Sequence, residues 1–153
     1  MIEPPIQDVY LGTVYTATHA GQACSFTFRP RPGDRSGAPK WPAPWAIITA
    51  YNPMSIALDA GANTHRAAEL MELLHARRLA SEPAENGAPD GAWREPGRII
   101  FGLTRDAALD LGRRFRQRAI VWCPGERVGL LDCLTERWTV RPIYPLPPPK
   151  TGI

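Results

Sequence analysis

Apolar and polar residues alternate along the first third of the chain in a way that predicts a β-hairpin. Residues 9–18 are rich in β-branched and aromatic side chains, and Cys24, Phe26 and Phe28 alternate with polar residues. Both patterns are typical of strands, and residues 19–22 have the composition of a turn. Prolines and glycines recur through residues 30–44, so we expect an exposed loop there.

Short apolar runs farther along the chain predict the remaining strands. The runs at residues 45–51 and 98–103 are nearly continuous, which is typical of strands covered on both faces. Further strands are expected at residues 119–123 and 128–134, on either side of Pro124-Gly125, with a short one at residues 138–140.

Two segments have the 3.6-residue apolar spacing of a helix. The first runs from about residue 64 to 79, with Asn63 or Thr64 as its N-cap. Thr104 is expected to cap the second helix, whose inner stripe includes Leu111 and Phe115. Between the first helix and the next strand, residues 81–97 are polar and rich in proline and glycine, which predicts a second loop.

The resulting element order, β-β-β-α-β-α-β-β, predicts an α/β fold, with α+β as the alternative. We expect a two-layer mixed sheet of five to seven strands with two main helices packed on it. Residues 1–141 would form a single domain, and residues 142–153 a proline-rich C-terminal tail.

Composition narrows the class of protein. The chain has 153 residues, of which 44% are hydrophobic and 22% charged, with a net charge of +3. No apolar run is long enough to cross a bilayer and the first residues do not resemble a signal peptide, so we expect a cytoplasmic protein without membrane contact. The three cysteines form no C-x-x-C motif and no cluster with histidine. We therefore predict no metal site and no cofactor, and we expect buried, reduced thiols.

The strand at residues 45–51 leads directly into candidate binding residues. If it ran parallel to the strand at 98–103, the carboxyl ends of both strands would share an edge, where ligands bind in such sheets. That edge would gather Tyr51, Asn52, Thr104 and the free N–H groups of the second helix. Asn63 and Arg66, at the start of the first helix, would close over the same place. Asn63 and Thr104 also fit a purely capping role.

Two further polar residues complete the candidate site. Glu95 lies beside Trp93, and an apolar neighbour raises a carboxyl pKa toward the range useful for general acid–base catalysis, so Glu95 is the candidate catalytic residue. A surface ion pair with a neighbouring arginine is the alternative interpretation of Glu95. Gln117, where the second helix passes to a strand, would orient a ligand or satisfy backbone groups. No nucleophile motif predicts a reaction.

Two other functions are consistent with the sequence. The arginine-rich end of the second helix could bind nucleic acid through its phosphates, using Arg113, Arg114, Arg116 and Arg118. Against this, Phe115 in the middle of the run is expected to be buried. Alternatively, the proline-rich loop or tail could dock a protein partner. The sequence pattern gives no information about the oligomeric state.

Several motifs together resemble a known family. These are W-A-I-I-T-A-Y-N-P-M-S at 45–55, Asn63 ahead of a helix, Trp93-x-Glu95, and the stretch 102–122 with its F-x-Q-x-A-I-x-W element. Over residues 45–123 the chain resembles the bacterial domain-of-unknown-function family numbered thirty-two ninety-three. The resemblance implies a compact α/β domain without an established activity, and it points to Asn52, Asn63, Glu95 and Gln117 as its shared polar residues. This chain has Arg116 where that family usually has glycine, and Gly97 where it usually has serine.

From the residues and the resemblance together, we expect a protein that binds a small polar or anionic, nucleotide-like ligand at the carboxyl edge of its central strands.

Overall fold

The computed structural model describes residues 6–52 and 56–147. Within this part of the chain there are three helices and nine strands. The helices are α1 (Ile6–Gly12), α2 (Ala60–Ala76) and α3 (Arg105–Arg114). The strands are β1 (Val14–His19), β2 (Gln22–Thr27), β3 (Trp45–Thr49), β4 (Ser81–Gly87), β5 (Arg94–Phe101), β6 (Ala119–Cys123), β7 (Gly129–Asp132), β8 (Trp138–Val140) and β9 (Tyr144–Leu146).

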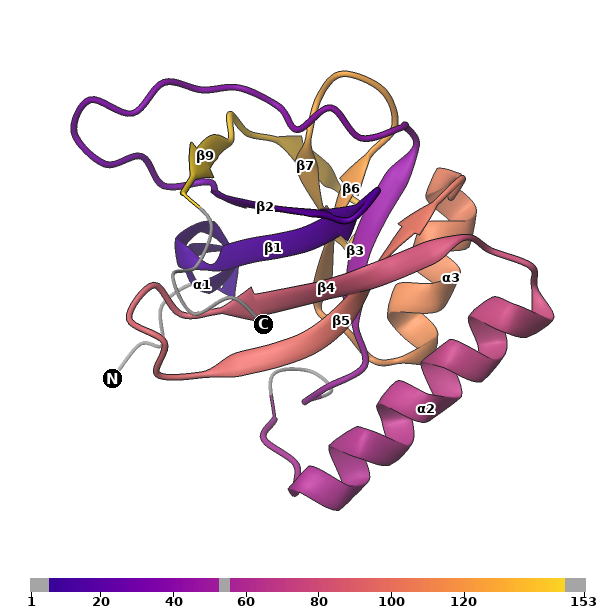
Figure 1. Ribbon diagram of the computed structural model, residues 1–153. Helices are drawn as coiled ribbons and strands as arrows, with labels where there is room; N and C mark the ends of the chain where they lie inside the picture. The colour runs from indigo at the N-terminus through magenta and orange to yellow at the C-terminus, as the bar shows by residue number, and fades with distance from the viewer. Residues whose placement is uncertain (1–5, 53–55, 148–153) are drawn as a thin grey trace.

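The strands form one sheet in the order β8-β7-β6-β3-β5-β4-β1-β2-β9. It curls into a half-barrel, with α2 and α3 beside one face (Figure 1). All the strand pairs in the described residues are antiparallel. The fold is therefore α+β, the alternative expectation, and the predicted mixed sheet of five to seven strands is wrong.

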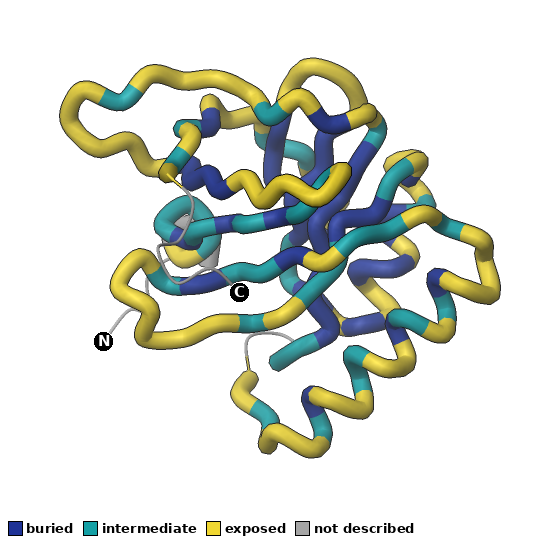
Figure 2. The backbone as a smooth tube through the Cα atoms, in the orientation of Figure 1, coloured by how far each residue is buried: buried dark blue, intermediate teal, exposed yellow. Residues whose placement is uncertain are grey.

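The central strand β3 is buried along its whole length, as its apolar run predicts. Successive side chains of a strand point to opposite faces. Ala46 and Ile48 pack with α2 and α3, while Trp45 and Ile47 join a second core with Phe26 on the other face. Figure 2 shows the burial concentrated in these central strands. A half-barrel with a core on each face explains why the run does not alternate with polar residues.

The predicted N-terminal hairpin is partly correct. Strands β1 and β2 pair, but the start of the segment assigned to the first strand lies in helix α1, and the Thr13 hydroxyl donates to Val9 O (2.8 Å) near the end of that helix. Cys24 is exposed, contrary to expectation, whereas Ser25 is buried. Ser25 is tolerated there because its hydroxyl hydrogen-bonds Thr16 Oγ1 (2.7 Å) on β1.

The loop predicted at residues 81–97 is wrong, because β4 and the first half of β5 occupy most of it. Proline cannot donate to a strand ladder and is tolerated where a neighbouring strand is missing. Pro83 lies just outside the β4 residues that pair with β1, and Pro96 lies just outside the β5 residues that pair with β3. Both prolines are exposed.

The helices begin close to their predicted positions. Thr104 caps α3, as predicted, and its side chain accepts from the Ala107 N–H. Asp59 caps α2, so both of the predicted caps, Asn63 and Thr64, lie inside that helix and the capping role predicted for them is wrong. No helix in the described residues is long and apolar enough to span a membrane.

The segment predicted to be a tail contributes a strand. Tyr144–Leu146 form β9 and pair with β2 at one end of the sheet. Residues 148–153 lie outside the described part of the chain.

Candidate functional site

The antiparallel sheet brings the predicted polar residues together by a route that differs from the one expected. Strands β3 and β5 are antiparallel, so the shared carboxyl edge does not exist. Instead, the residues that follow β3 lie beside those at the start of β5 and those that precede β6, since Thr49 pairs with Gly97 and Ile47 with Val121. Asn52, Glu95 and Gln117 therefore meet at one end of β3. Thr104 follows β5 and lies at the opposite end, away from this group.

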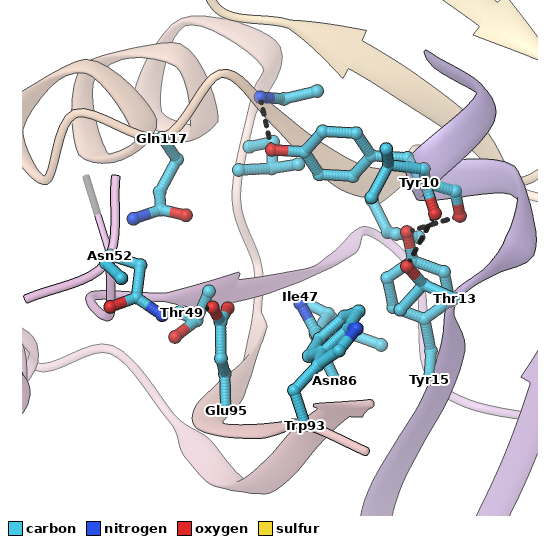
Figure 3. A pocket seen from close by; sticks show the side chains of 15 residues that line it. Tyr10, Thr13, Tyr15, Ile47, Thr49, Asn52, Asn86, Trp93, Glu95 and Gln117 are labelled. Atoms are coloured by element: carbon cyan, nitrogen blue, oxygen red, sulfur yellow. Dashed lines mark hydrogen bonds between the residues drawn. The ribbon is translucent and has the colours of Figure 1, made fainter. Parts of the chain in front are cut away.

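A pocket of about 210 Å³ opens on the face of the sheet opposite α2 and α3. It lies between α1 and strands β1, β3, β4, β5 and β6, and Figure 3 shows Glu95 and Gln117 directed toward its interior. Its lining is formed by Val9, Tyr10, Thr13, Tyr15, Ile47, Thr49, Asn52, Ala57, Asn86, Trp93, Glu95, Gln117, Ala119, Ile120 and Val121.

Two hydrogen-bonded asparagines, Asn52 and Asn63, hold the turn that borders this pocket. The Asn52 backbone N–H donates to Asn63 Oδ1 (2.9 Å), and Asn63 Nδ2 donates back to Asn52 Oδ1 (2.9 Å). Asn52 Oδ1 also accepts from the Leu58 N–H (3.0 Å). Asn52 has a φ of +48°, a left-handed conformation that asparagine tolerates better than most residues. This network fixes the turn after β3 and leaves the Asn52 amide nitrogen directed at Glu95.

Glu95 is the ionisable carboxyl of the pocket lining. Asn52 Nδ2 donates to Glu95 Oε1 over 2.7 Å, and the carboxyl group is half-buried. Burial raises the pKa of Glu95, and the hydrogen bond from Asn52 offsets part of that increase. Glu95 is therefore held in one orientation and retains its proton to a higher pH than an exposed glutamate.

Gln117 presents an oxygen to the pocket. Its side chain is only 5% exposed, and its Nε2 donates to Tyr51 O (3.1 Å) and Phe115 O (3.2 Å). Because carbonyl oxygens accept and cannot donate, the amide nitrogen faces them and the amide oxygen faces the pocket (Figure 3).

The other predicted site residues support the backbone and lie outside the pocket lining. Arg66 Nε donates to Ala50 O (2.8 Å), and its terminal nitrogen donates to Phe115 O, so its guanidinium ties the end of β3 to the end of α3. Tyr51 contributes its carbonyl to Gln117. Asn63 acts through Asn52. The proposed contacts of Arg66, Tyr51 and Asn63 with a ligand therefore have no support in the geometry.

The arginine run at the end of α3 lies apart from the pocket lining. Arg113 contacts Glu136 (3.2 Å) and donates to Cys133 O, and Arg118 lies 3.8 Å from Asp132. Arg114 and Arg116 are exposed. Phe115 is buried, as predicted.

Several lining residues were not identified from the sequence. Tyr10 and Thr13 come from a segment predicted to be a strand, and Asn86 from one predicted to be a loop. The Tyr10 hydroxyl accepts from the Ala119 N–H (3.3 Å), which fixes α1 against β6. One signal was available for Asn86: the Pro-Asp-Gly sequence at 89–91 is typical of a hairpin turn between two strands.

Comparison with known proteins gives one finding. The family described as "Protein of unknown function (DUF3293)" matches residues 48–120. This confirms the resemblance seen in the sequence. The matched segment contains Asn52, Asn63, Glu95 and Gln117, the four polar residues to which that resemblance points. No curated protein and no solved structure gives a significant match.

Proposed function

We propose that this protein binds a small polar molecule in the pocket beside Glu95 and Gln117. The observation that carries the proposal is the Asn63–Asn52–Glu95 chain of hydrogen bonds, which ends on a carboxylate directed into a cavity. Each amide of that chain is satisfied inside the protein. Binding sites need groups whose orientation is fixed in this way by their surroundings.

The energetic cost of partly burying the Glu95 carboxylate also supports a binding role. Burying part of a carboxylate costs stability, as the raised pKa of Glu95 indicates. No arginine, lysine or histidine is among the described residues of the pocket lining. The alternative interpretation of Glu95, a surface ion pair, therefore has no cationic partner within the lining. Costly polar groups at cavities are typical of functional sites.

The same lining argues against the anionic ligand expected from the sequence. Arg66 was to neutralise such a ligand, but its guanidinium is bonded to two backbone carbonyls outside the lining. We therefore restrict the proposal to polar ligands without net negative charge. Glu95 would accept or return a proton if the bound molecule reacts.

Nucleic-acid binding is the weaker alternative. Two of its four arginines, Arg113 and Arg118, face acidic side chains, which reduces the positive charge available for phosphates. No observation on the described residues favours docking of a protein partner by the proline-rich segments.

A pocket-filling variant tests the proposal. Ala119→Leu adds a larger side chain to the pocket wall and removes no side-chain hydrogen bond. Ala23→Leu makes the same change at an exposed position of β2. Two-dimensional amide NMR with a panel of neutral and cationic metabolites is expected to shift the signals of Thr49, Glu95 and Ala119. The shifts should persist in Ala23→Leu and disappear in Ala119→Leu. A panel that shifts none of these signals in the wild-type protein would refute the pocket as a binding site.

A further inference from the structure

The charge of the pocket lining restricts the class of ligand. Glu95 is the carboxylate among the described lining residues, and none of them is lysine, arginine or histidine. The Arg66 guanidinium, which the sequence assigned to an anionic ligand, donates to Ala50 O and Phe115 O and lies outside the lining. An anion would therefore meet a carboxylate and no compensating cation. A positively charged group would find a counter-ion in the same place.

The hydrogen-bond donors and acceptors of three lining residues, Asn52, Gln117 and Thr49, also favour a cationic ligand. One of the two Asn52 Nδ2–H groups is donated to Glu95, and the Gln117 amide nitrogen donates to two carbonyls. The Thr49 hydroxyl proton is donated to Pro96 O (2.9 Å). The acceptors that these side chains leave for a ligand are the oxygens of the Glu95 carboxylate and of the Gln117 amide. A ligand that uses both acceptors supplies N–H or O–H donors to them.

The size and walls of the cavity favour a flat group. At about 210 Å³, the cavity is smaller than the roughly 300–1,000 Å³ of a typical drug-sized site. Trp93, 39% exposed, and Tyr10 place aromatic rings in the lining (Figure 3). Aromatic faces bind cations and stack on flat groups.

We propose that the pocket takes a small planar cation with several N–H donors, of the amidinium or guanidinium type, paired with Glu95 and hydrogen-bonded to Gln117. This inference rests on the proposed function, because it names the class of ligand for the same pocket. The fork of two N–H groups in such ions matches a carboxylate in geometry as well as in charge.

The experiment compares three probes of nearly equal shape. Benzamidine is a planar cation, benzamide is neutral, and benzoate is an anion with acceptors alone. In amide NMR titrations of the full chain, benzamidine is expected to shift the signals of Thr49, Glu95 and Ala119 with the highest affinity. Benzamide is expected to bind at least tenfold more weakly, and benzoate to leave these signals unchanged. N-acetylargininamide, added as a fourth probe, carries the guanidinium of an arginine side chain. Tighter binding of N-acetylargininamide than of benzamidine would indicate a partner's arginine as the ligand, and the reverse order would indicate a free small cation.

A matched pair of variants tests the role of the carboxylate. Glu95→Gln keeps the acceptor for Asn52 and removes the charge, so benzamidine should bind about tenfold to a hundredfold more weakly. Glu85→Gln makes the same change on the neighbouring strand β4, outside the pocket, and should leave binding unchanged.

The results separate this inference from the function on which it rests. Benzoate binding at the pocket as tightly as benzamidine would overturn the ligand class while leaving the pocket as a binding site. Unchanged benzamidine affinity in Glu95→Gln would do the same. If none of the probes shifts the pocket signals, the ligand class is overturned, and the wider metabolite panel then decides whether the proposed function fails as well.

Discussion

Removing the Asn63 side chain should destabilise the protein strongly, although Asn63 lies outside the pocket lining. Asn63 is 5% exposed, and its side chain takes part in three hydrogen bonds, accepting from the Asn52 N–H and donating to Asn52 Oδ1 and Leu58 O. Asn63→Ala leaves the Asn52 N–H without its acceptor. An unsatisfied buried group costs about 1–3 kcal/mol, and each lost bond about 0.5–1.5 kcal/mol.

These contributions overlap, so the expected loss in the free energy of unfolding is about 2–4 kcal/mol. That is a large share of the ~5–15 kcal/mol typical of a folded domain. Urea unfolding followed by tryptophan fluorescence measures it, and the midpoint should fall without a change in slope. A loss below about 0.5 kcal/mol would refute the view that this network holds the turn after β3.

Asn63→Asp tests the direction of the bonds. The new carboxylate still accepts from the Asn52 N–H, but its second oxygen meets two acceptors, Asn52 Oδ1 and Leu58 O. Only the protonated acid can donate there, so folding should raise the pKa of the substituted side chain.

The sign of the pH effect follows from that raised pKa. The deficit relative to wild type should be smallest below the unfolded value of about 3.9 and should grow as the pH rises through the folded value. Asn63→Ala introduces no titrating group and serves as the control, with a deficit that stays constant over the same pH range. Equal deficits of Asn63→Asp at pH 4 and pH 7 would contradict the assigned donor and acceptor roles.

Three further predictions concern other parts of the fold. A Cβ on Gly112 would lie 2.6 Å from Cys133 Sγ, so Gly112→Ala should destabilise the protein by about 1–3 kcal/mol, and adding Cys133→Ala should recover part of that loss in urea unfolding. Because burial raises the pKa of Glu95, the wild type loses stability as the pH rises above about 4.3, and Glu95→Gln should therefore gain stability relative to it between pH 4 and pH 7. Thr104→Ala removes the N-cap of α3 and should cost about 1 kcal/mol in thermal unfolding, while pocket binding, at the other end of β3, stays unchanged.

Part of the candidate site could be predicted because its chemistry is local. Asn52 follows an apolar strand, Glu95 stands beside Trp93, and Gln117 lies where a helix gives way to a strand. Each is a polar residue at the boundary of a buried element. The motifs that contain them also carry the family resemblance, which the match over residues 48–120 confirms.

The way in which these residues meet could not be predicted, because strand direction is a tertiary property. The apolar run at 45–51 is compatible with a parallel or an antiparallel neighbour, since burial on both faces produces the same pattern in either case. The parallel assumption placed Thr104 in the site and attributed the meeting of the other residues to a shared carboxyl edge. With antiparallel partners, residues after β3 lie beside those at the start of β5 and those that precede β6.

The sequence by itself determined the buried strands, two of the three helices, the cap at Thr104 and the identity of the principal polar groups, because apolar spacing and capping act within a few residues. Tertiary structure alone decided the strand order and the pairing of residues 81–97 as a hairpin. It also decided which polar residues support the backbone and which face the pocket. Arg66 and Asn63 are bound to backbone and amide partners more than ten positions away in the chain, whereas Glu95 and Gln117 direct oxygens into the cavity (Figure 3). Which atom of a polar side chain is left for a ligand depends on which partners have already satisfied the others, and those partners are brought together only by the fold.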